Sequence, residues 1–105
     1  MEMQISEIRK KIAPVVKKYP IAKLAVFGSY ASGTANKKSD IDLLVEFDKK
    51  SKISLFDYSG IKLDFEERLG KKVDLVQYKN IKPLLKDYII GSEKEIYVKK
   101  SKNIS

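Results

Sequence analysis

The 105-residue sequence contains no cysteine and no histidine. These two absences exclude disulfide bonds, thiol nucleophiles, the serine–histidine–aspartate triad and the usual zinc sites. A metal ion on this chain would therefore be held by oxygen ligands, as Mg²⁺, Mn²⁺ and Ca²⁺ are. The side chains that remain for catalysis are carboxylates, lysines, tyrosines and hydroxyls.

The sequence also lacks a long apolar run and an apolar leader. No segment approaches the ~20 apolar residues that cross a membrane, and the N-terminal segment MEMQISEIRK has no signal-peptide core. We therefore expect a cytoplasmic protein with no membrane partner. The length fits a single domain over residues 1–105, with an N-terminal helix within 1–19 and a mobile tail over 99–105.

Arginine is scarce, since Arg9 and Arg68 are the only two, and lysine supplies nearly all of a formal net charge of +8. Such a charge can attract nucleic acid or nucleotide phosphates. The lysines are scattered through every segment, which favours an ordinary solvated surface. No aromatic-basic strand motif of an RNA-binding module is present, so nucleic acid ranks last among the expected partners.

Hydrophobic periodicity predicts alternating helices and strands. The expected helices cover about residues 4–18, 54–69 and 83–91, and the expected strands cover 22–27, 41–47 and 72–78. Pro14 should kink the first helix or start a second piece, Gly70 occupies the position of a helix C-cap, and Pro83 opens the last helix. The segment EIYVK is a short edge strand or continued helix, and we prefer the strand. This order predicts an α/β fold, a small mixed β-sheet with helices packed on it.

Two aspartates, Asp40 and Asp42, stand at the start of the predicted strand 41–47. Residues two apart in a strand face the same way, so both carboxylates project from one side. Like charges in this arrangement repel, and strands disfavour aspartate, so the pair does not serve stability. A divalent cation between the two carboxylates would convert the repulsion into binding.

Asp74 repeats this arrangement between two apolar residues of the predicted strand 72–78. If that strand lies beside 41–47, three carboxylates converge at one rim and can hold two Mg²⁺ ions. Taken singly, each carboxylate is more simply a cap or a charge that protects a strand edge. Their shared placement in short apolar strands favours a site.

The stretch GSYASG, Gly28 to Gly33, follows the predicted strand 22–27. Glycine directly after a strand lets backbone N–H groups approach an anion, and Ser29 adds a hydroxyl donor. A plain strand-to-helix turn capped by serine is the simpler alternative. Thr34 stands where a Walker A loop needs lysine, which excludes a P-loop, and no G-x-G-x-x-G follows a strand.

The segment GSYASGTANKKSDIDLLV resembles the signature of the DNA-polymerase-β-type nucleotidyltransferases: Gly-Ser, a ten-residue spacer and Asp-x-Asp. Gly28, Ser29, Asp40 and Asp42 match it, and Asp74 in KKVDLV matches the third carboxylate. The resemblance covers about residues 20–98, and the small size is similar to that of the minimal nucleotidyltransferases, called MNT. These are often the antitoxin partners of HEPN-domain RNases.

The sequence departs from this family at Tyr30 and Ser32. Many members carry arginine there, in G-S-R-A-R-G, and neither replacement can bind a phosphate bidentately. Lys37 and Lys38 can supply mobile point charges instead. The departure concerns affinity for the nucleotide and leaves the expected metal site intact.

The resemblance implies the polymerase-β-like fold and the Mg²⁺-dependent transfer of a nucleoside monophosphate, AMP from ATP, to a hydroxyl of a HEPN toxin. One Mg²⁺ would be held by Asp40 and Asp42, with the terminal phosphates cradled by Gly28 and Ser29. A second Mg²⁺ would be bridged by all three aspartates, and Asp74 would take the acceptor proton. Two alternatives stay open: a non-catalytic antitoxin that acts by occlusion, which the missing arginines favour, and a nucleic-acid-directed transferase.

The predicted helix from Ser54 to Leu69 carries apolar residues on two sides. The main stripe is expected to face the sheet and consists of Leu55, Tyr58, Ile61, Phe65 and Leu69. Phe56 and Leu63 lie together well off that stripe. We expect this pair to contact either a second copy of the chain or the toxin partner, unless both residues fold under the 49–53 loop or against the first helix.

Overall fold

The computed structural model describes residues 3–81 and 93–99. In chain order these residues form α1 (Ile5–Lys18), β1 (Ile21–Phe27), α2 (Gly28–Ser32), β2 (Ile41–Phe47), α3 (Leu55–Leu69), β3 (Val73–Gln77), the 3-10 turn η1 (Tyr78–Asn80) and β4 (Lys94–Val98). The four strands belong to one sheet in the order β3-β2-β1-β4. The helix predicted over 83–91 lies outside the described residues.

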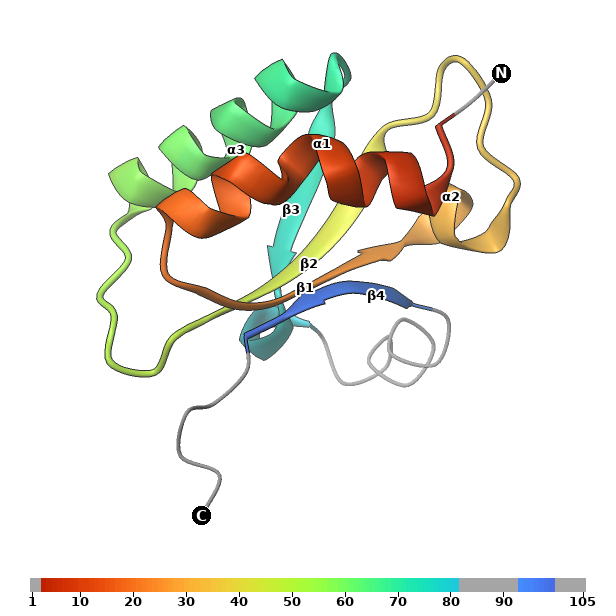
Figure 1. Cartoon of the computed structure of the whole chain (residues 1–105). Helices are drawn as coiled ribbons and strands as arrows, with labels where there is room; N and C mark the ends of the chain where they lie inside the picture. The colour runs from red at the N-terminus through yellow and green to blue at the C-terminus, as the bar shows by residue number, and fades with distance from the viewer. Residues whose placement is uncertain (1–2, 82–92, 100–105) are drawn as a thin grey trace.

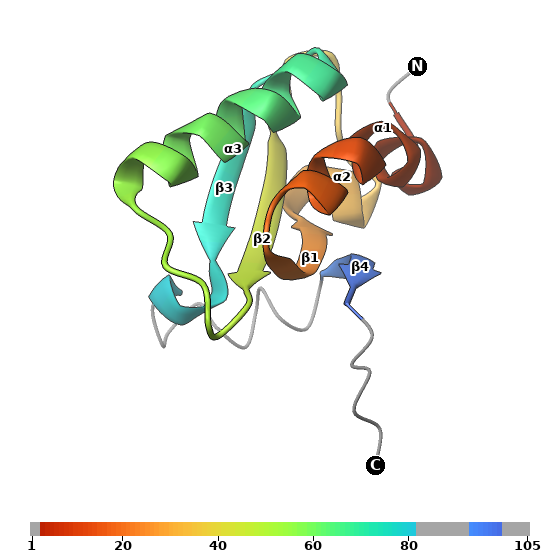
Figure 2. The same cartoon turned by 60° about the vertical axis from the view of Figure 1, so that its left-hand side comes forward.

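The sheet is mixed, because β2 runs parallel to β3 whereas β1 is antiparallel to both β2 and β4. Figures 1 and 2 both show α1 and α3 side by side over one face of the sheet. The predicted α/β class, with helices packed on a small mixed sheet, is confirmed. Within residues 3–81 and 93–99, no helix has the length and apolar content needed to cross a membrane.

The hydrophobic core lies between these two helices and the sheet. Ile8 and Ile12 of α1 and Ile61 and Phe65 of α3 are almost completely buried. The alternate residues that β2 adds to this core are Ile41, Leu43 and Val45. Because side chains alternate along a strand, Asp42 falls on the opposite face of the sheet, away from α1 and α3.

The predicted strands match the structure closely. The bounds of β2 are those predicted, β1 begins one residue earlier, and β3 is one residue shorter at each end. Residues 94–98 form β4 at the edge of the sheet, which confirms the preference for a strand over continued helix. Lys99, which we expected to begin a mobile tail, donates its backbone N–H to the Ala22 carbonyl at 2.8 Å, and its Nζ lies 2.8 Å from Oδ2 of Asp48.

The first helix continues through Pro14. The residue lies inside α1, so the expected start of a second piece is wrong. Proline lacks the N–H that would bond to the Lys10 carbonyl. Both residues are exposed, so water can satisfy that carbonyl, while Ile12, Val15 and Val16 hold this part of the helix in the core.

The helix α3 has a cap at each end. The Ser54 hydroxyl accepts the Asp57 N–H at 3.0 Å, and the Asp57 carboxylate accepts the Ser54 N–H at 3.1 Å, which together form a capping box. At the other end Gly70 adopts a left-handed φ of 69° and donates its N–H to the Glu66 carbonyl at 2.8 Å. The capping role predicted for Gly70 is confirmed.

The buried stripe of α3 is shorter than predicted. Its buried and half-buried members are Tyr58, Ile61, Phe65 and Leu69. Leu55 was expected in the same stripe, but it is 88% exposed. At about 100° per residue, Leu55 is turned roughly 80° away from Phe65 around the helix axis, so at the first turn of the helix it falls off the core-facing side.

Side chains bond to backbone groups at both edges of the sheet. Alternation along β3 turns the N–H of Val73 and the C=O of Leu75 away from β2. Glu66 of α3 accepts the Val73 N–H at 3.0 Å, and the Tyr58 hydroxyl donates to the Leu75 carbonyl. At the other edge, Arg9 of α1 donates to two backbone carbonyls of β4, each at 3.3 Å. Four backbone groups of the two edge strands are thereby occupied.

Candidate active site

The candidate active site lies where β2 and β3 begin. In the parallel ladder, Asp42 of β2 pairs with Asp74 of β3. Neighbouring strands are about 4.8 Å apart and paired residues point to the same face, so these two carboxylates share one side of the sheet. Asp40 directly precedes β2. The parallel pairing therefore brings the three predicted aspartates to one end of the sheet.

Burial and two acidic neighbours act on the Asp42 carboxylate. Burial raises the pKa of Asp42 to about 6, and the negative charges of Asp74 and Asp40 add to this rise. Asp42 is half-buried, whereas Asp40 and Asp74 are exposed. The charged form of Asp42 is thus disfavoured both by loss of water and by its neighbours. This is an arrangement that costs stability unless a cation offsets it.

The donor set suits an oxygen-preferring divalent cation. A cation between the carboxylates would offset the repulsion that adds to the effect of burial on the Asp42 pKa. Within residues 3–81 and 93–99, however, no group of three acidic side chains is gathered closely enough to hold an ion. The two-ion arrangement of Asp40, Asp42 and Asp74 stays a prediction, while the placement of Asp42 beside Asp74 is observed.

Gly28 lies against the Asp42 carboxylate. A Cβ atom at position 28 would collide with Oδ2 of Asp42. The residue also has a φ of 70°, in the left-handed region that favours glycine. The left-handed φ and the nearby carboxylate both disfavour a larger residue here. The backbone at the end of β1 therefore lies beside a candidate catalytic carboxylate.

The stretch GSYASG folds into the single helical turn α2, directly after β1. The Ser29 carbonyl accepts the N–H groups of Gly33 and Thr34, the latter at 2.9 Å. The Ser32 hydroxyl lies 3.3 Å from the same carbonyl and 2.9 Å from the Thr34 hydroxyl. This network fixes the turn and holds the backbone of Gly28 and Ser29 beside the start of β2.

Tyr30 belongs to the hydrophobic core. Only 6% of the residue is exposed, so its side chain packs in the core at a position where many members of the resembled family carry arginine. The Ser32 hydroxyl bonds within the turn. Neither residue presents a cation to the candidate site, in agreement with the departure that the sequence shows. Lys37 and Lys38 are exposed on the loop that follows.

Lys71 is a residue near the site that the sequence reasoning missed. Its Nζ donates to the carbonyls of Lys37 at 3.1 Å and Ser39 at 3.3 Å, and lies 5.8 Å from the centre of the Tyr30 ring. These contacts tie the loop that delivers Asp40 to the segment that leads into β3. The only signal in the sequence was a lysine between the helix cap and the strand, which is too common to single out.

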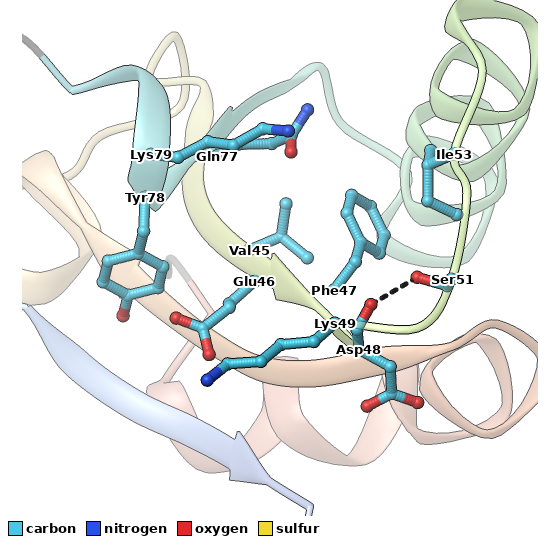
Figure 3. A pocket seen from close by; sticks show the side chains of 10 residues that line it. All are labelled: Val45, Glu46, Phe47, Asp48, Lys49, Ser51, Ile53, Gln77, Tyr78 and Lys79. Atoms are coloured by element: carbon cyan, nitrogen blue, oxygen red, sulfur yellow. Dashed lines mark hydrogen bonds between the residues drawn. The ribbon is translucent and has the colours of Figure 1, made fainter.

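Figure 3 shows a pocket of about 270 Å³ at the opposite end of β2 and β3. Phe47 and Ile53 line it together with Lys49, and the Ser51 hydroxyl donates to the Asp48 carbonyl at 2.6 Å beside it. The predicted site residues do not line this pocket. Because β2 and β3 are parallel, their starting ends carry the aspartates and their far ends carry the pocket. The candidate site at the starting ends, where the three aspartates lie, stays a prediction.

Comparison with known proteins adds independent findings. The model of the family described as polymerase beta, nucleotidyltransferase matches residues 10–102. A Methanocaldococcus jannaschii protein named as a protein adenylyltransferase is 43% identical to this chain over 94 residues, which are 90% of this chain and 99% of the relative.

Two solved structures resemble this one. A structure described as a minimal nucleotidyltransferase has a TM-score of 0.72 at 29% identity, and the match covers 89% of this chain and 96% of the other. A chain of the structure of the tri-AMPylated Shewanella oneidensis HEPN toxin in complex with an MNT antitoxin has a TM-score of 0.67 at 17% identity, covering 91% and 74%. The second likeness is one of fold.

Proposed function

This chain belongs to the polymerase beta nucleotidyltransferase family, and on that premise we propose that it transfers AMP from ATP to a hydroxyl of a HEPN-type toxin, as the toxin's antitoxin. It is a nucleotidyltransferase of minimal size. The observation that carries the proposal is the parallel register that sets Asp42 opposite Asp74, with Gly28 against the Asp42 carboxylate. The relative named as a protein adenylyltransferase and the AMPylated toxin in the similar complex support the substrate and the partner.

In the proposed reaction, Gly28 and Ser29 hold the nucleotide's phosphates. The missing side chain of Gly28 lets the main chain approach closely. Among the described residues, the Ser29 hydroxyl has no hydrogen-bond partner, so it is available to a phosphate oxygen. A pair of Mg²⁺ ions, when bound by Asp40, Asp42 and Asp74, would supply positive charge to the phosphates and acidify the acceptor hydroxyl.

Asp74 is the proposed general base. It is exposed and can reach an acceptor brought by another protein, whereas Asp42 beside it is half-buried. The acceptor oxygen forms a bond to the α-phosphorus, the bond from that phosphorus to the bridging oxygen breaks, and pyrophosphate leaves. The acceptor proton goes to Asp74. The chain contributes position and charge to this step.

A non-catalytic antitoxin that acts by occlusion is the second candidate. The buried side chain of Tyr30 and the internally bonded hydroxyl of Ser32 favour it, because no arginine holds the phosphates. The presence of all three carboxylates opposes it. The two candidates can be told apart by covalent labelling of the toxin, which a catalytic antitoxin would produce and an occluding one would not.

The deciding experiment incubates the purified chain with a candidate HEPN-type toxin, Mg²⁺ and ATP labelled at the α-phosphate. We expect label on the toxin, lost with Asp74→Asn while toxin binding persists. An excess of unlabelled GTP or CTP should leave the labelling intact if the nucleotide is ATP. A wild-type chain that binds the toxin and transfers no label would establish occlusion instead.

A further inference from the structure

Asp40 is the one predicted site aspartate that lies outside a strand. Asp42 belongs to β2 and Asp74 belongs to β3, where pairing with the neighbouring strand fixes the backbone. Asp40 is exposed and ends the segment 33–40, which leads from α2 to β2. Loop residues are more mobile than strand residues unless other contacts hold them. The place of the Asp40 carboxylate therefore depends on what holds this segment.

The turn that precedes Asp40 is closed by its own hydrogen bonds. The Ser39 N–H donates to the Asn36 carbonyl at 3.0 Å, and the Ser39 hydroxyl accepts the Asn36 N–H at 2.9 Å. The Lys38 N–H donates to the side-chain oxygen of Asn36 at 2.8 Å. These bonds fix the shape of the turn, but they lie within residues 36–39 and do not attach the turn to the sheet.

Lys71 attaches this turn to the segment that leads into β3. Its Nζ donates to the carbonyls of Lys37 at 3.1 Å and Ser39 at 3.3 Å. The Ser39 carbonyl belongs to the peptide group directly before Asp40. Hydrogen bonds from a charged donor are stronger than those between neutral groups, so one half-buried ammonium holds the turn at two points.

The peptide group directly after Asp40 is bonded to the next residue of the same segment. The Ile41 N–H donates to the Lys72 carbonyl at 3.0 Å. Asp40 therefore lies between two peptide groups that are bonded to residues 71 and 72. The bond of Ile41 comes from the pairing of β2 with β3, whereas the bond of Ser39 depends on a single side chain. Loss of that side chain would release the backbone on one side of Asp40.

Lys71 also contacts the helical turn α2. Its Nζ lies 5.8 Å from the centre of the Tyr30 ring, within the range of a cation–π contact. Tyr30 is buried in the core, so its ring gives the ammonium a fixed support. One side chain thus joins α2, the turn before Asp40 and the segment that leads to Asp74.

We propose that Lys71 is a positioning residue of the active site, which holds Asp40 at the end of the sheet where Asp42 and Asp74 lie. The proposal rests on the proposed function, in which the three carboxylates act together. Lys71 acts through backbone carbonyls and touches neither the nucleotide nor the acceptor. Without this side chain the turn would keep its shape and move about its ends. Asp40 would then occupy many positions, of which few are productive.

Direct binding of a phosphate by Lys71 is the alternative. An ammonium has three N–H donors, and two of them already bond to the carbonyls of Lys37 and Ser39. Strong phosphate binding would have to break these bonds and release the turn, so the geometry favours the positioning role. The two roles differ in kinetics, because a lost phosphate contact weakens ATP binding whereas a displaced Asp40 slows the transfer step.

The first test measures backbone order parameters of the full chain by NMR relaxation, without nucleotide or toxin. In the wild-type chain, residues 37–40 should have the values of rigid backbone, about 0.85. Lys71→Met should lower these values toward about 0.6 and leave the far end of β2 unchanged. Lys72→Met is the matched control, because this lysine is exposed and its side chain has no hydrogen-bond or ion-pair partner among the described residues.

The second test compares the same variants in the transfer assay at saturating toxin. Lys71→Met should lower kcat by about tenfold or more, while the KM for ATP and the melting temperature stay close to those of wild type. Lys71→Arg should recover transfer, because a guanidinium can donate to both carbonyls. Lys72→Met should match wild type in every quantity.

Four outcomes decide the proposal. A Lys71→Met variant that keeps wild-type order parameters over residues 37–40 overturns it, as does one whose turn becomes mobile while kcat holds. A raised KM for ATP with unchanged kcat would make Lys71 a nucleotide-binding residue and also overturn it. A wild-type chain that labels no toxin would refute the proposed function, and the order parameters would still decide whether Lys71 holds the turn. If Lys71→Met fails to fold, Lys71→Gln, which is neutral and keeps an N–H donor, takes its place.

Discussion

At the start of β2, Asp42 stands half-buried beside two other carboxylates, whereas one residue beyond the end of the same strand Asp48 lies 2.8 Å from Nζ of Lys99. Within the described residues, Asp42 has no ion-pair partner. At the end of the strand the carboxylate of Asp48 is neutralised by a lysine, whereas at its start like charges lie together. Repulsion kept at the start of β2, with no cation to offset it among the described residues, indicates that those charges serve chemistry.

We expect the largest effect from Asp42→Asn, which removes a charge from the acidic end of β2. The substitution keeps the shape of the side chain and removes the charge, so AMP transfer should fall by about a thousandfold or more, equivalent to about 4 kcal/mol in the barrier. Because repulsion is relieved, the melting temperature should hold or rise. Both quantities should be measured on the same preparation. A steep fall in melting temperature would instead make Asp42 a structural residue, and undiminished transfer would remove it from the site.

Gly28→Ala should give the largest loss of stability. The new Cβ would collide with the Asp42 carboxylate, and the backbone would stay in a left-handed conformation, so we expect a loss of about 2 kcal/mol. Gly33→Ala is the matched control, because position 33 has a φ of 80° but open space around it; it should cost about 1 kcal/mol.

Chemical denaturation of a double variant separates the collision from the backbone strain. In an Asp42→Ala background the colliding oxygen is gone, so Gly28→Ala should cost only what Gly33→Ala costs. If the loss of unfolding free energy in the double variant equalled the sum of the losses in the two single variants, the close approach of Gly28 to the carboxylate would be contradicted.

The pH dependence of stability tests whether Asp42 is held in a place that disfavours its charge. The pKa of Asp42 rises from 3.8 to about 6 on folding, so the folded state binds this proton more tightly than the unfolded state. Lowering the pH from above 6 toward 4 should therefore stabilise the wild-type chain relative to Asp42→Asn. Water still reaches the half-buried group, so we expect a gain of about 1 kcal/mol. Urea titrations of wild type and Asp42→Asn at several pH values in this range would measure the gain. If the free energy of unfolding changed with pH equally in the two proteins, the prediction would be wrong.

The smallest effect is expected at the neutralised end of the strand. Asp48→Asn removes the carboxylate that contacts Lys99, and an exposed ion pair of this kind contributes little to stability. Lys99→Met should give a similar loss, and neither variant should change AMP transfer. Salt should reduce the difference from wild type. Loss of transfer in Asp48→Asn would mean that the far end of β2 takes part in the reaction.

The elements of the candidate site were predictable because they follow from local rules. The alternation of apolar and acidic residues placed β2 correctly, and same-face spacing joined Asp40 to Asp42. The role of Asp74 was conditional, since only the parallel pairing of β2 with β3 could place it opposite Asp42. Sequence patterns indicate which way a side chain points on its own strand. They do not indicate which strand lies next to that strand in the sheet.

The errors and omissions arose from contacts between distant segments. Leu55 fits an apolar stripe by spacing, yet the stripe leaves the core at the first turn of α3. The reach of Lys71 to the carbonyls of Lys37 and Ser39 depends on how two loops meet. The burial of Tyr30 could not be read from a motif in which the family places arginine. Each depends on the assembled fold.

The bonds from α3 to the outer edge of β3 have a consequence for synthesis of the chain. Glu66 and Tyr58 are made before Val73 and Leu75, whose backbone groups they occupy in the finished fold. Two backbone groups on the outer edge of β3 can therefore be satisfied as soon as this strand packs against α3, with no need for a segment that is made later.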